Sequence, residues 1–238
     1  SIKAGLFTPS GELLEERKIP TPELIDADAY AVVTDGLAKI LAAHDAEPAD
    51  VIALGLDIPG PVADDGTVGF LPNIKLDPEG LVDAVNAAFP NATVAFVNDA
   101  NAAAMGEMTY GAARGMKNFI MITLGTGVGS GIVINGEMVY GHDGFAGELG
   151  HTTIVRHNGR RCNCGRNGCL ETYCSAIGVA RTAREWLDMS DQPSALRSLD
   201  SISSKDVYEA AKEGDALAIK IFEYTGTLLG QAFADFIA

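Results

Sequence analysis

The chain has 238 residues, 47% hydrophobic and 21% charged, with 17 basic against 32 acidic side chains. That length suits one large domain or two smaller lobes with a buried core. The net charge of −15 opposes binding to nucleic acid or to an anionic membrane surface. No stretch has the pattern of a signal peptide or a membrane span, so we expect a cytoplasmic protein.

The first hundred residues alternate between strand-like and helix-like patterns. Apolar runs bounded by Gly and Pro indicate strands, and apolar residues three and four apart indicate helices. In chain order the predicted elements are strands at 2–7 and 12–19 that form a hairpin, a helix from Thr21 to Leu41, a strand at 51–56, a helix at 79–89 and a strand at 93–97.

The rest of the chain combines a second set of strands with more helices. Its predicted elements are an alanine-rich helix after Asn101, strands at 119–124 and 130–134, a hairpin turn at Asn135-Gly136, an ordered loop at 141–168, and helices from about Ser175 onward with a polar link at 190–204. The mixture of strands, hairpins and long helices indicates an α/β protein. We expect two lobes, 1–98 and 99–238.

A glycine-rich segment, Gly-Thr-Gly-Val-Gly-Ser-Gly at 125–131, joins two predicted strands. Phosphate groups bind where backbone N–H groups converge and no Cβ blocks their approach. The segment lacks the lysine and the following helix of a P-loop. A tight hairpin and a phosphate-binding loop are therefore both open interpretations.

A polar motif, Asn98-Asp99-Ala100-Asn101, follows the apolar strand predicted at 93–97. Ligands of α/β proteins gather at the carboxyl ends of strands, and an aspartate there can accept a proton from a hydroxyl group. Asp or Asn is also a common N-cap for a helix such as the alanine-rich one that follows. Taken alone, the motif is explained by the cap.

All four cysteines lie within residues 162–174, near two histidines. Such clustering indicates a metal site in a reducing compartment rather than a disulfide scaffold. Three thiols spaced Cys-x-Cys-x4-Cys and one imidazole form a common zinc-binding set, here His151, Cys162, Cys164 and Cys169. His157 could replace His151, and Cys174 could complete a four-cysteine site or be a small buried side chain.

Two carboxylates, Glu148 and Glu171, flank the cysteine loop. A carboxylate suits sugar hydroxyls because each of its oxygens can accept hydrogen bonds. If the loop folds around a metal, both carboxylates can point into one pocket. The alternative for each is a solvated surface charge.

Together these segments resemble the ROK family (repressors, open reading frames and kinases) over most of the chain. The most specific part runs from Gly-Glu-Leu-Gly-His at 147–151 to Cys-x-Cys-Gly-x-x-Gly-Cys-x-Glu at 162–171. Leu-x-x-Pro-Gly-Pro at 56–61 and Asn-Asp-x-Asn at 98–101 follow the family order. The resemblance implies an actin-like, ribonuclease H-like ATPase fold of two lobes, with ATP and sugar between them.

The resemblance also implies a role for each motif in an ATP-dependent sugar kinase. Asp99 is expected to be the base that takes a proton from the sugar hydroxyl. The residues expected to hold the sugar are Gly60, Asn73, Asn98, Glu148, His151 and Glu171. Those expected to hold the ATP phosphates are Gly125, Thr126 and Gly127, with Mg²⁺ bound chiefly through the nucleotide. Zinc on His151, Cys162, Cys164 and Cys169 is expected to be structural.

Glucose is the expected substrate, because the carboxylate and histidine set and the loop at 141–150 resemble those of bacterial glucokinases. N-acetylmannosamine, N-acetylglucosamine, allose and fructose stay open. Two other classes also stay open, a sugar-responsive transcriptional repressor and a non-catalytic sugar-binding or zinc-stabilised structural protein, although Asp99 favours an enzyme. The family pattern also leads us to expect a homodimer or a higher homo-oligomer.

Two segments of the family pattern are missing from the 238 residues. An Asp-x-Gly-Gly-Thr phosphate motif is expected ahead of Ser1, and a glycine-rich adenosine-binding segment beyond Ala238. We therefore expect a fold that is incomplete at both ends, and no kinase activity from these residues alone.

Overall fold

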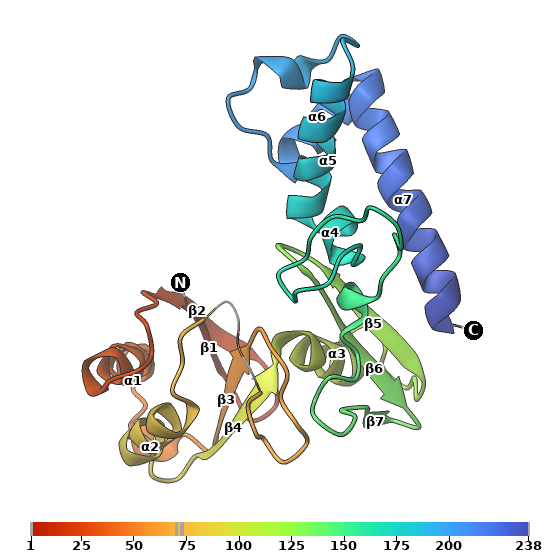
Figure 1. Ribbon diagram of the computed structural model, residues 1–238. Coiled ribbons are helices and arrows are strands. Elements are labelled where there is room, and N and C mark those ends of the chain that lie inside the picture. The colour runs from red at the N-terminus through yellow and green to blue at the C-terminus, as the bar shows by residue number, and fades with distance from the viewer. Residues whose placement is uncertain (1, 70, 72–73, 238) are drawn as a thin grey trace. The chain divides into compact units, whose positions relative to one another are not determined.

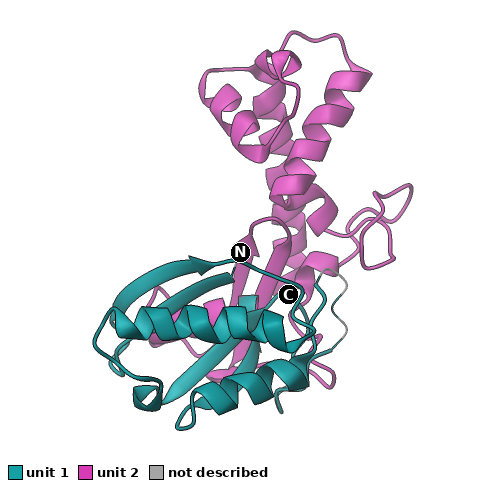
Figure 2. Ribbon diagram, turned by 90° about the vertical axis from the view of Figure 1, so that its left-hand side faces the viewer, with its two compact units in different colours: residues 1–99 teal, residues 100–238 magenta. Residues whose placement is uncertain are grey.

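A computed structural model describes residues 2–69, 71 and 74–237 (Figure 1). Its contacts divide the chain into two compact units, Ser1–Asp99 and Ala100–Ala238, which Figure 2 draws in different colours. The division follows Asp99, whereas the sequence places the lobe boundary after residue 98. Each unit has its own strands, helices and buried core.

Unit 1 contains a hairpin, a parallel strand pair and two covering helices. Its elements are β1 (Ile2–Phe7), β2 (Leu13–Ile19), α1 (Ala27–Ala42), a 3₁₀ turn (Pro48–Asp50), β3 (Ala53–Ile58), α2 (Pro78–Ala88) and β4 (Thr93–Asn98). The predicted hairpin is confirmed, since β1 and β2 pair antiparallel. Strands β3 and β4 pair parallel, with Ile58 opposite Asn98. Their carboxyl ends therefore meet at one edge.

Helices α1 and α2 lie side by side against the strands of unit 1 (Figures 1 and 2). Apolar residues from both helices and both parallel strands make one core: Tyr30, Val33, Leu41, Ile58, Val62, Leu81, Val85, Phe89 and Phe96. The N-cap of α2, Asp77, accepts hydrogen bonds from the Gly80 amide at 3.2 Å and the Tyr30 hydroxyl at 2.9 Å. This cap joins the two helices.

The predicted start of the first helix at Thr21 is wrong. Leu24 instead forms a parallel bridge with Leu76, donating to the Lys75 carbonyl at 3.1 Å and accepting from the Asp77 amide at 2.8 Å. These bonds hold the backbone extended. The helix begins only after Asp26, whose carboxylate caps the Ala29 amide at 2.9 Å.

Unit 2 combines an antiparallel sheet with a helical region. Its elements are α3 (Asp99–Thr109), β5 (Phe119–Leu124), β6 (Val128–Ile134), β7 (Glu137–Met138), a 3₁₀ turn (Leu149–His151), α4 (Glu171–Cys174), α5 (Ala176–Met189), a 3₁₀ turn (Ala195–Ser198), α6 (Ser204–Lys212) and α7 (Ala216–Ile237). The sheet order is β5-β6-β7. Asn135 and Gly136 have φ values of 56° and 84°, as the predicted tight hairpin turn requires.

Helices α5, α6 and α7, with the segment between α5 and α6, bury a second apolar core. Its members are Val179, Ala183, Leu196, Ile202, Val207, Ala210, Leu217, Ala218 and Ile221. Within the described residues, none of the helices combines the length and apolarity that crossing a bilayer requires.

Candidate active site and metal centre

The carboxyl edge of β3 and β4 in unit 1 gathers several predicted site residues. The buried side chain of Asn98 donates through Nδ2 to the Gly60 carbonyl at 2.9 Å. Asp99 follows directly, as the last residue of this unit and the first of α3. It therefore lies where the sequence predicts either a base or a helix start.

Asp57 adds a second carboxylate to this edge. It lies opposite Val97 in the register of the parallel pair, one residue before the end of β3. Partial burial, and then repulsion from the Asp99 carboxylate, raise the pKa of Asp57 above its usual value. Asp57 and Asp99 thus form an interacting acidic pair.

A compact cluster of one imidazole and three thiols lies in unit 2. The potential ligand atoms of His151, Cys162, Cys164 and Cys169 all lie within 4.8 Å of one another. Nδ1 of His151 is 3.5 Å from the Cys162 sulfur, and the sulfurs of Cys164 and Cys169 are 3.6 Å apart. The four residues are those that the sequence nominates as zinc ligands.

The two alternative ligands lie outside this cluster. His157 is exposed and is not among the four grouped side chains. Cys174 is buried in α4, where its thiol faces the Thr225 carbonyl at 3.8 Å. Of the two interpretations of Cys174, the structure thus favours the small buried side chain.

The thiols of the cluster differ strongly in acidity. Burial raises the pKa of Cys164, but hydrogen bonds with the backbone and side chain of Arg166 outweigh it and lower that pKa to about 6. Burial and the two neighbouring thiols raise the pKa of Cys169 to about 12. Three crowded thiols cannot all ionise unless a cation offsets their mutual repulsion. The donor set therefore fits a divalent metal.

His151 lies between this cluster and a carboxylate. Its Nδ1 faces Cys162, while its Nε2 is 3.9 Å from Oε2 of Glu148. The 3₁₀ turn Leu149–His151 puts the two side chains three positions apart on one turn. A metal held through Nδ1 would leave the Nε2 proton directed at Glu148.

The glycine-rich segment forms a tight turn that contacts the second carboxylate. Gly125 donates to the Gly127 carbonyl at 3.0 Å, and β6 begins at Val128, two residues before the strand predicted at 130–134. The Val128 amide donates to Oε2 of Glu171 at 3.1 Å. A Cβ on Gly127 would lie only 2.4 Å from that same oxygen, so the close approach depends on glycine.

Comparison with known proteins places these features in a family. The model of the ROK family matches residues 1–238. The chain belongs to the ROK family. A glucokinase of Halalkalibacterium halodurans is 39% identical over 243 residues, covering 99% of this chain and 72% of that relative. The predicted resemblance is therefore confirmed.

Two solved ROK structures are similar over nearly the whole chain. A ROK family glucokinase from Streptomyces griseus, in complex with glucose and AMPPNP, has a TM-score of 0.78 and 34% identity, covering 98% of this chain and 75% of its own. A ROK family transcriptional regulator, described as a homolog of the E. coli MLC protein, has a TM-score of 0.83 and 30% identity. The chain spans 58% of that regulator's length. The predicted α/β, actin-like fold is confirmed.

Two residues mark the limits of the sequence prediction for this ROK chain. Asn73, predicted to hold sugar, lies outside the described residues. Asp57 was not predicted at all. The signal that could have found it is a carboxylate at the end of an apolar run, just before Pro59-Gly60-Pro61. Recognising that run and 93–97 as parallel neighbours would place Asp57 near Asp99.

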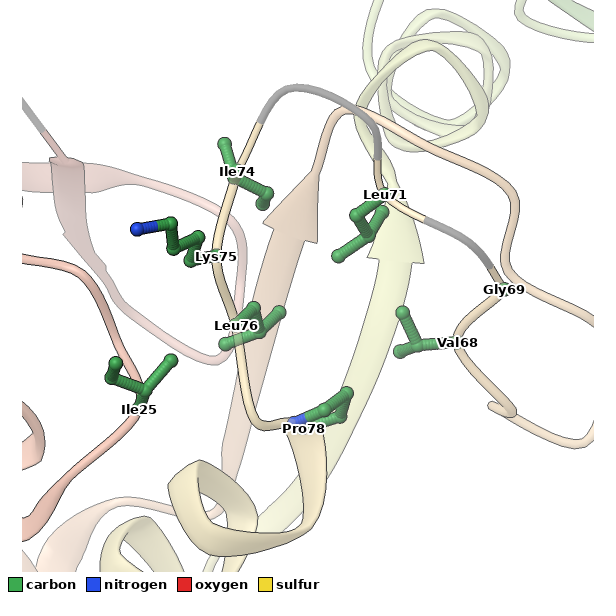
Figure 3. Close-up of a pocket in the computed structure, with 8 residues that line it drawn as sticks. All are labelled: Ile25, Val68, Gly69, Leu71, Ile74, Lys75, Leu76 and Pro78. Atoms are coloured by element: carbon green, nitrogen blue, oxygen red, sulfur yellow. The ribbon is translucent and has the colours of Figure 1, made fainter.

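Unit 1 also contains an open hollow of about 450 Å³, shown in Figure 3. Its lining residues are Ile25, Val68, Gly69, Leu71, Ile74, Lys75, Leu76 and Pro78. The one charged side chain among them, Lys75, pairs with Glu23 at 2.8 Å. Among the described residues, no predicted site residue lines this hollow, but the Leu71 side chain in its lining lies close to Gly60, where an added Cβ would meet it at 2.3 Å.

Proposed function

We propose that this ROK protein is an ATP-dependent kinase that phosphorylates glucose to glucose 6-phosphate. The observation that carries the proposal is the similarity, over nearly the whole chain, to glucokinases that include one solved with glucose and AMPPNP. The chemistry of the motifs agrees with it. Phosphoryl transfer depends on positioning and charge neutralisation more than on covalent help from the protein.

Asp99 is the proposed catalytic base. Its place after β4 puts a carboxylate at the carboxyl edge of a parallel strand pair, where α/β proteins bind their ligands. As phosphoryl transfer proceeds, this carboxylate accepts the proton of the attacking sugar hydroxyl. Asn98 and Gly60, joined by their hydrogen bond, are proposed to fix the sugar beside it.

The proposed sugar-binding residues of unit 2 are Glu148, His151 and Glu171. Glu171 accepts from Val128 through Oε2, so Oε1 is the atom proposed to accept a sugar hydroxyl. His151 is proposed to donate its single Nε2 proton to a sugar hydroxyl, and Glu148, whose Oε2 is 3.9 Å from that nitrogen, to accept from the sugar. These assignments give the sugar both donors and acceptors, as specific recognition of hydroxyl groups requires.

The turn formed by Gly125, Thr126 and Gly127 is proposed to receive the phosphates of Mg²⁺–ATP. Gly125 and Thr126 are exposed, and the Cβ position of Gly125 meets no atom within 4 Å. A phosphate can therefore approach the backbone of this turn closely. The turn has no lysine, so the proposal gives neutralisation of the phosphate charge to the magnesium ion.

Zinc is the metal proposed for His151, Cys162, Cys164 and Cys169. One imidazole and three thiolates make a closed tetrahedral set, which is typical of structural zinc. When bound, zinc would cross-link the turn after Glu148 to the loop before Glu171. The ion would therefore hold in place the segments that carry both carboxylates.

The test is a coupled assay of the full-length protein with Mg²⁺–ATP and a panel of hexoses. We expect the highest kcat/KM with glucose. A higher value with N-acetylmannosamine, N-acetylglucosamine, allose or fructose would correct the substrate, and no turnover with any sugar would refute the kinase proposal.

A ROK transcriptional regulator is the second candidate, favoured by the similarity to the MLC homolog. The net charge of −15 opposes DNA binding by these residues. A gel-shift experiment with operator DNA of related regulators distinguishes the two. Sugar-dependent DNA binding without kinase turnover would establish the regulator.

A further inference from the structure

A buried arginine lies at the entrance to the cysteine loop. The side chain of Arg160 is 7% exposed. Its five N–H donors find partners in α4 and α5: Nε and Nη2 donate to Oε2 of Glu185 at 3.1 and 2.6 Å, Nη2 to Oγ1 of Thr182 at 2.9 Å, and Nη1 to the carbonyls of Thr172 and Gly178 at 2.9 and 3.3 Å. The guanidinium group therefore forms hydrogen bonds with both helices.

The backbone of Arg160 is bonded just as closely. Its amide donates to the Tyr173 hydroxyl at 2.9 Å, and its carbonyl accepts from the Gly168 amide at 2.8 Å. The guanidinium carbon also lies 4.4 Å from the centre of the Tyr173 ring, within cation–π range. Arg160 therefore connects the loop that holds the three thiols to the helix that follows it.

The corner between α4 and α5 bears directly on the glycine-rich turn (Figure 1). Glu171, the first residue of α4, accepts from the Val128 amide at 3.1 Å. Ala176, the first residue of α5, donates to the Gly125 carbonyl at 2.8 Å. Any displacement of this corner must therefore move or break both contacts with the turn.

Stability alone is a weak explanation for this arrangement. Replacing a buried ion pair by apolar side chains is often neutral or stabilising, because desolvating two charges is costly. A guanidinium group fixes the relative positions of several acceptors, because its five donors lie in one rigid plane. The acceptors of the Arg160 guanidinium belong to α4, which begins at Glu171, and to α5, whose N-cap is Ser175.

We propose that Arg160 is a positioning residue that couples the cysteine loop to the glycine-rich turn through the α4–α5 corner. Its consequence for catalysis rests on the proposed kinase function, but the coupling itself does not. In the kinase, Arg160 keeps the Glu171 carboxylate and the turn 125–127 in register, so its loss weakens substrate binding before it slows chemistry.

Hydrogen–deuterium exchange of the full-length protein tests the coupling. Arg160→Gln should raise exchange in peptides covering 125–131 by about tenfold or more, the change expected when charge-assisted hydrogen bonds are lost. Peptides covering 205–221 in α6 and α7 should change little. A uniform increase over both regions, or no change at 125–131, would overturn the proposal.

Arg181→Gln is the matched control. Arg181 also pairs with Glu185, at 2.8 Å, but its side chain is 43% exposed. Replacing Arg181 removes one of the two cationic partners of the Glu185 carboxylate and leaves Arg160 in place. The exchange of 125–131 should then match the wild type. An equal effect of both variants would mean that the charge on Glu185 matters and the position of Arg160 does not.

Thr182→Val keeps the test usable if Arg160→Gln does not fold. It preserves volume and removes one acceptor from Nη2, so a smaller increase in the same direction is expected at 125–131. In the kinase assay, Arg160→Gln and Thr182→Val should each raise the KM for substrate by a larger factor than they lower kcat. Unchanged exchange in Thr182→Val would contradict the coupling, whereas absent kinase turnover in the wild type would contradict only the proposed function.

Discussion

Gly150→Ala should disturb a close backbone contact beneath the candidate site. A Cβ at this buried position would lie 2.0 Å from the Val128 carbonyl oxygen and 3.0 Å from the Val128 carbonyl carbon. Ordinary van der Waals contact begins at about 3.4 Å, so the backbones must separate by about 1.4 Å. We expect a loss of about 1–3 kcal/mol in the free energy of unfolding, the usual cost of overpacking a core.

Urea denaturation followed by circular dichroism measures this loss. Gly226→Ala is the control, because Gly226 lies exposed in α7 and its Cβ would meet nothing within 4 Å. That variant should gain up to about 1 kcal/mol from helix propensity. Since Gly150 stands between Glu148 and His151, its replacement should also lower metal retention. A Gly150→Ala protein as stable as the wild type would refute the packing argument.

Three further predictions concern the metal and the acidic pair. Elemental analysis of protein purified without added metal should find one zinc per chain, and Cys164→Ser should lose it, with a lower unfolding midpoint. His157→Ala and Cys174→Ala should retain the zinc; loss of metal in either would mean that the ligand set is wrong. Asp57→Asn should stabilise the protein at neutral pH, because a raised pKa means that ionising Asp57 costs folding free energy as the pH rises. The difference from the wild type in thermal melts should shrink below about pH 4, where Asp57 is protonated in both states.

The sequence predicts most of the elements because their signals are local. Asn135-Gly136 has the dipeptide that a tight hairpin turn needs, and both residues adopt positive φ. The predicted start of α1 was wrong, because the true start depends on a partner that is distant in the sequence. Thr21-Pro22 looks like a helix start, but Leu24 bonds to a segment some fifty residues later in the chain.

The candidate site shows the same division. The spacing of Cys162, Cys164 and Cys169 lies within one loop, so the sequence could nominate the cluster before any fold was known. Asp57 and Arg160 were missed, because their importance depends on neighbours brought together by folding. A single aspartate or arginine carries no signal until its partners are placed.

The central claim, that this ROK protein is a sugar kinase with Asp99 as its base, is tested most directly by one substitution. Asp99→Asn keeps the shape and the capping ability of the side chain but removes its basicity. With Mg²⁺–ATP and glucose, the full-length variant should lose roughly 10²–10⁴-fold in kcat, the usual worth of general-base catalysis, with little change in glucose affinity or thermal stability. Asp83→Asn, on the exposed face of α2, should leave kcat unchanged. A kcat near the wild-type value in Asp99→Asn would contradict the account and make Glu148 the next candidate for the base.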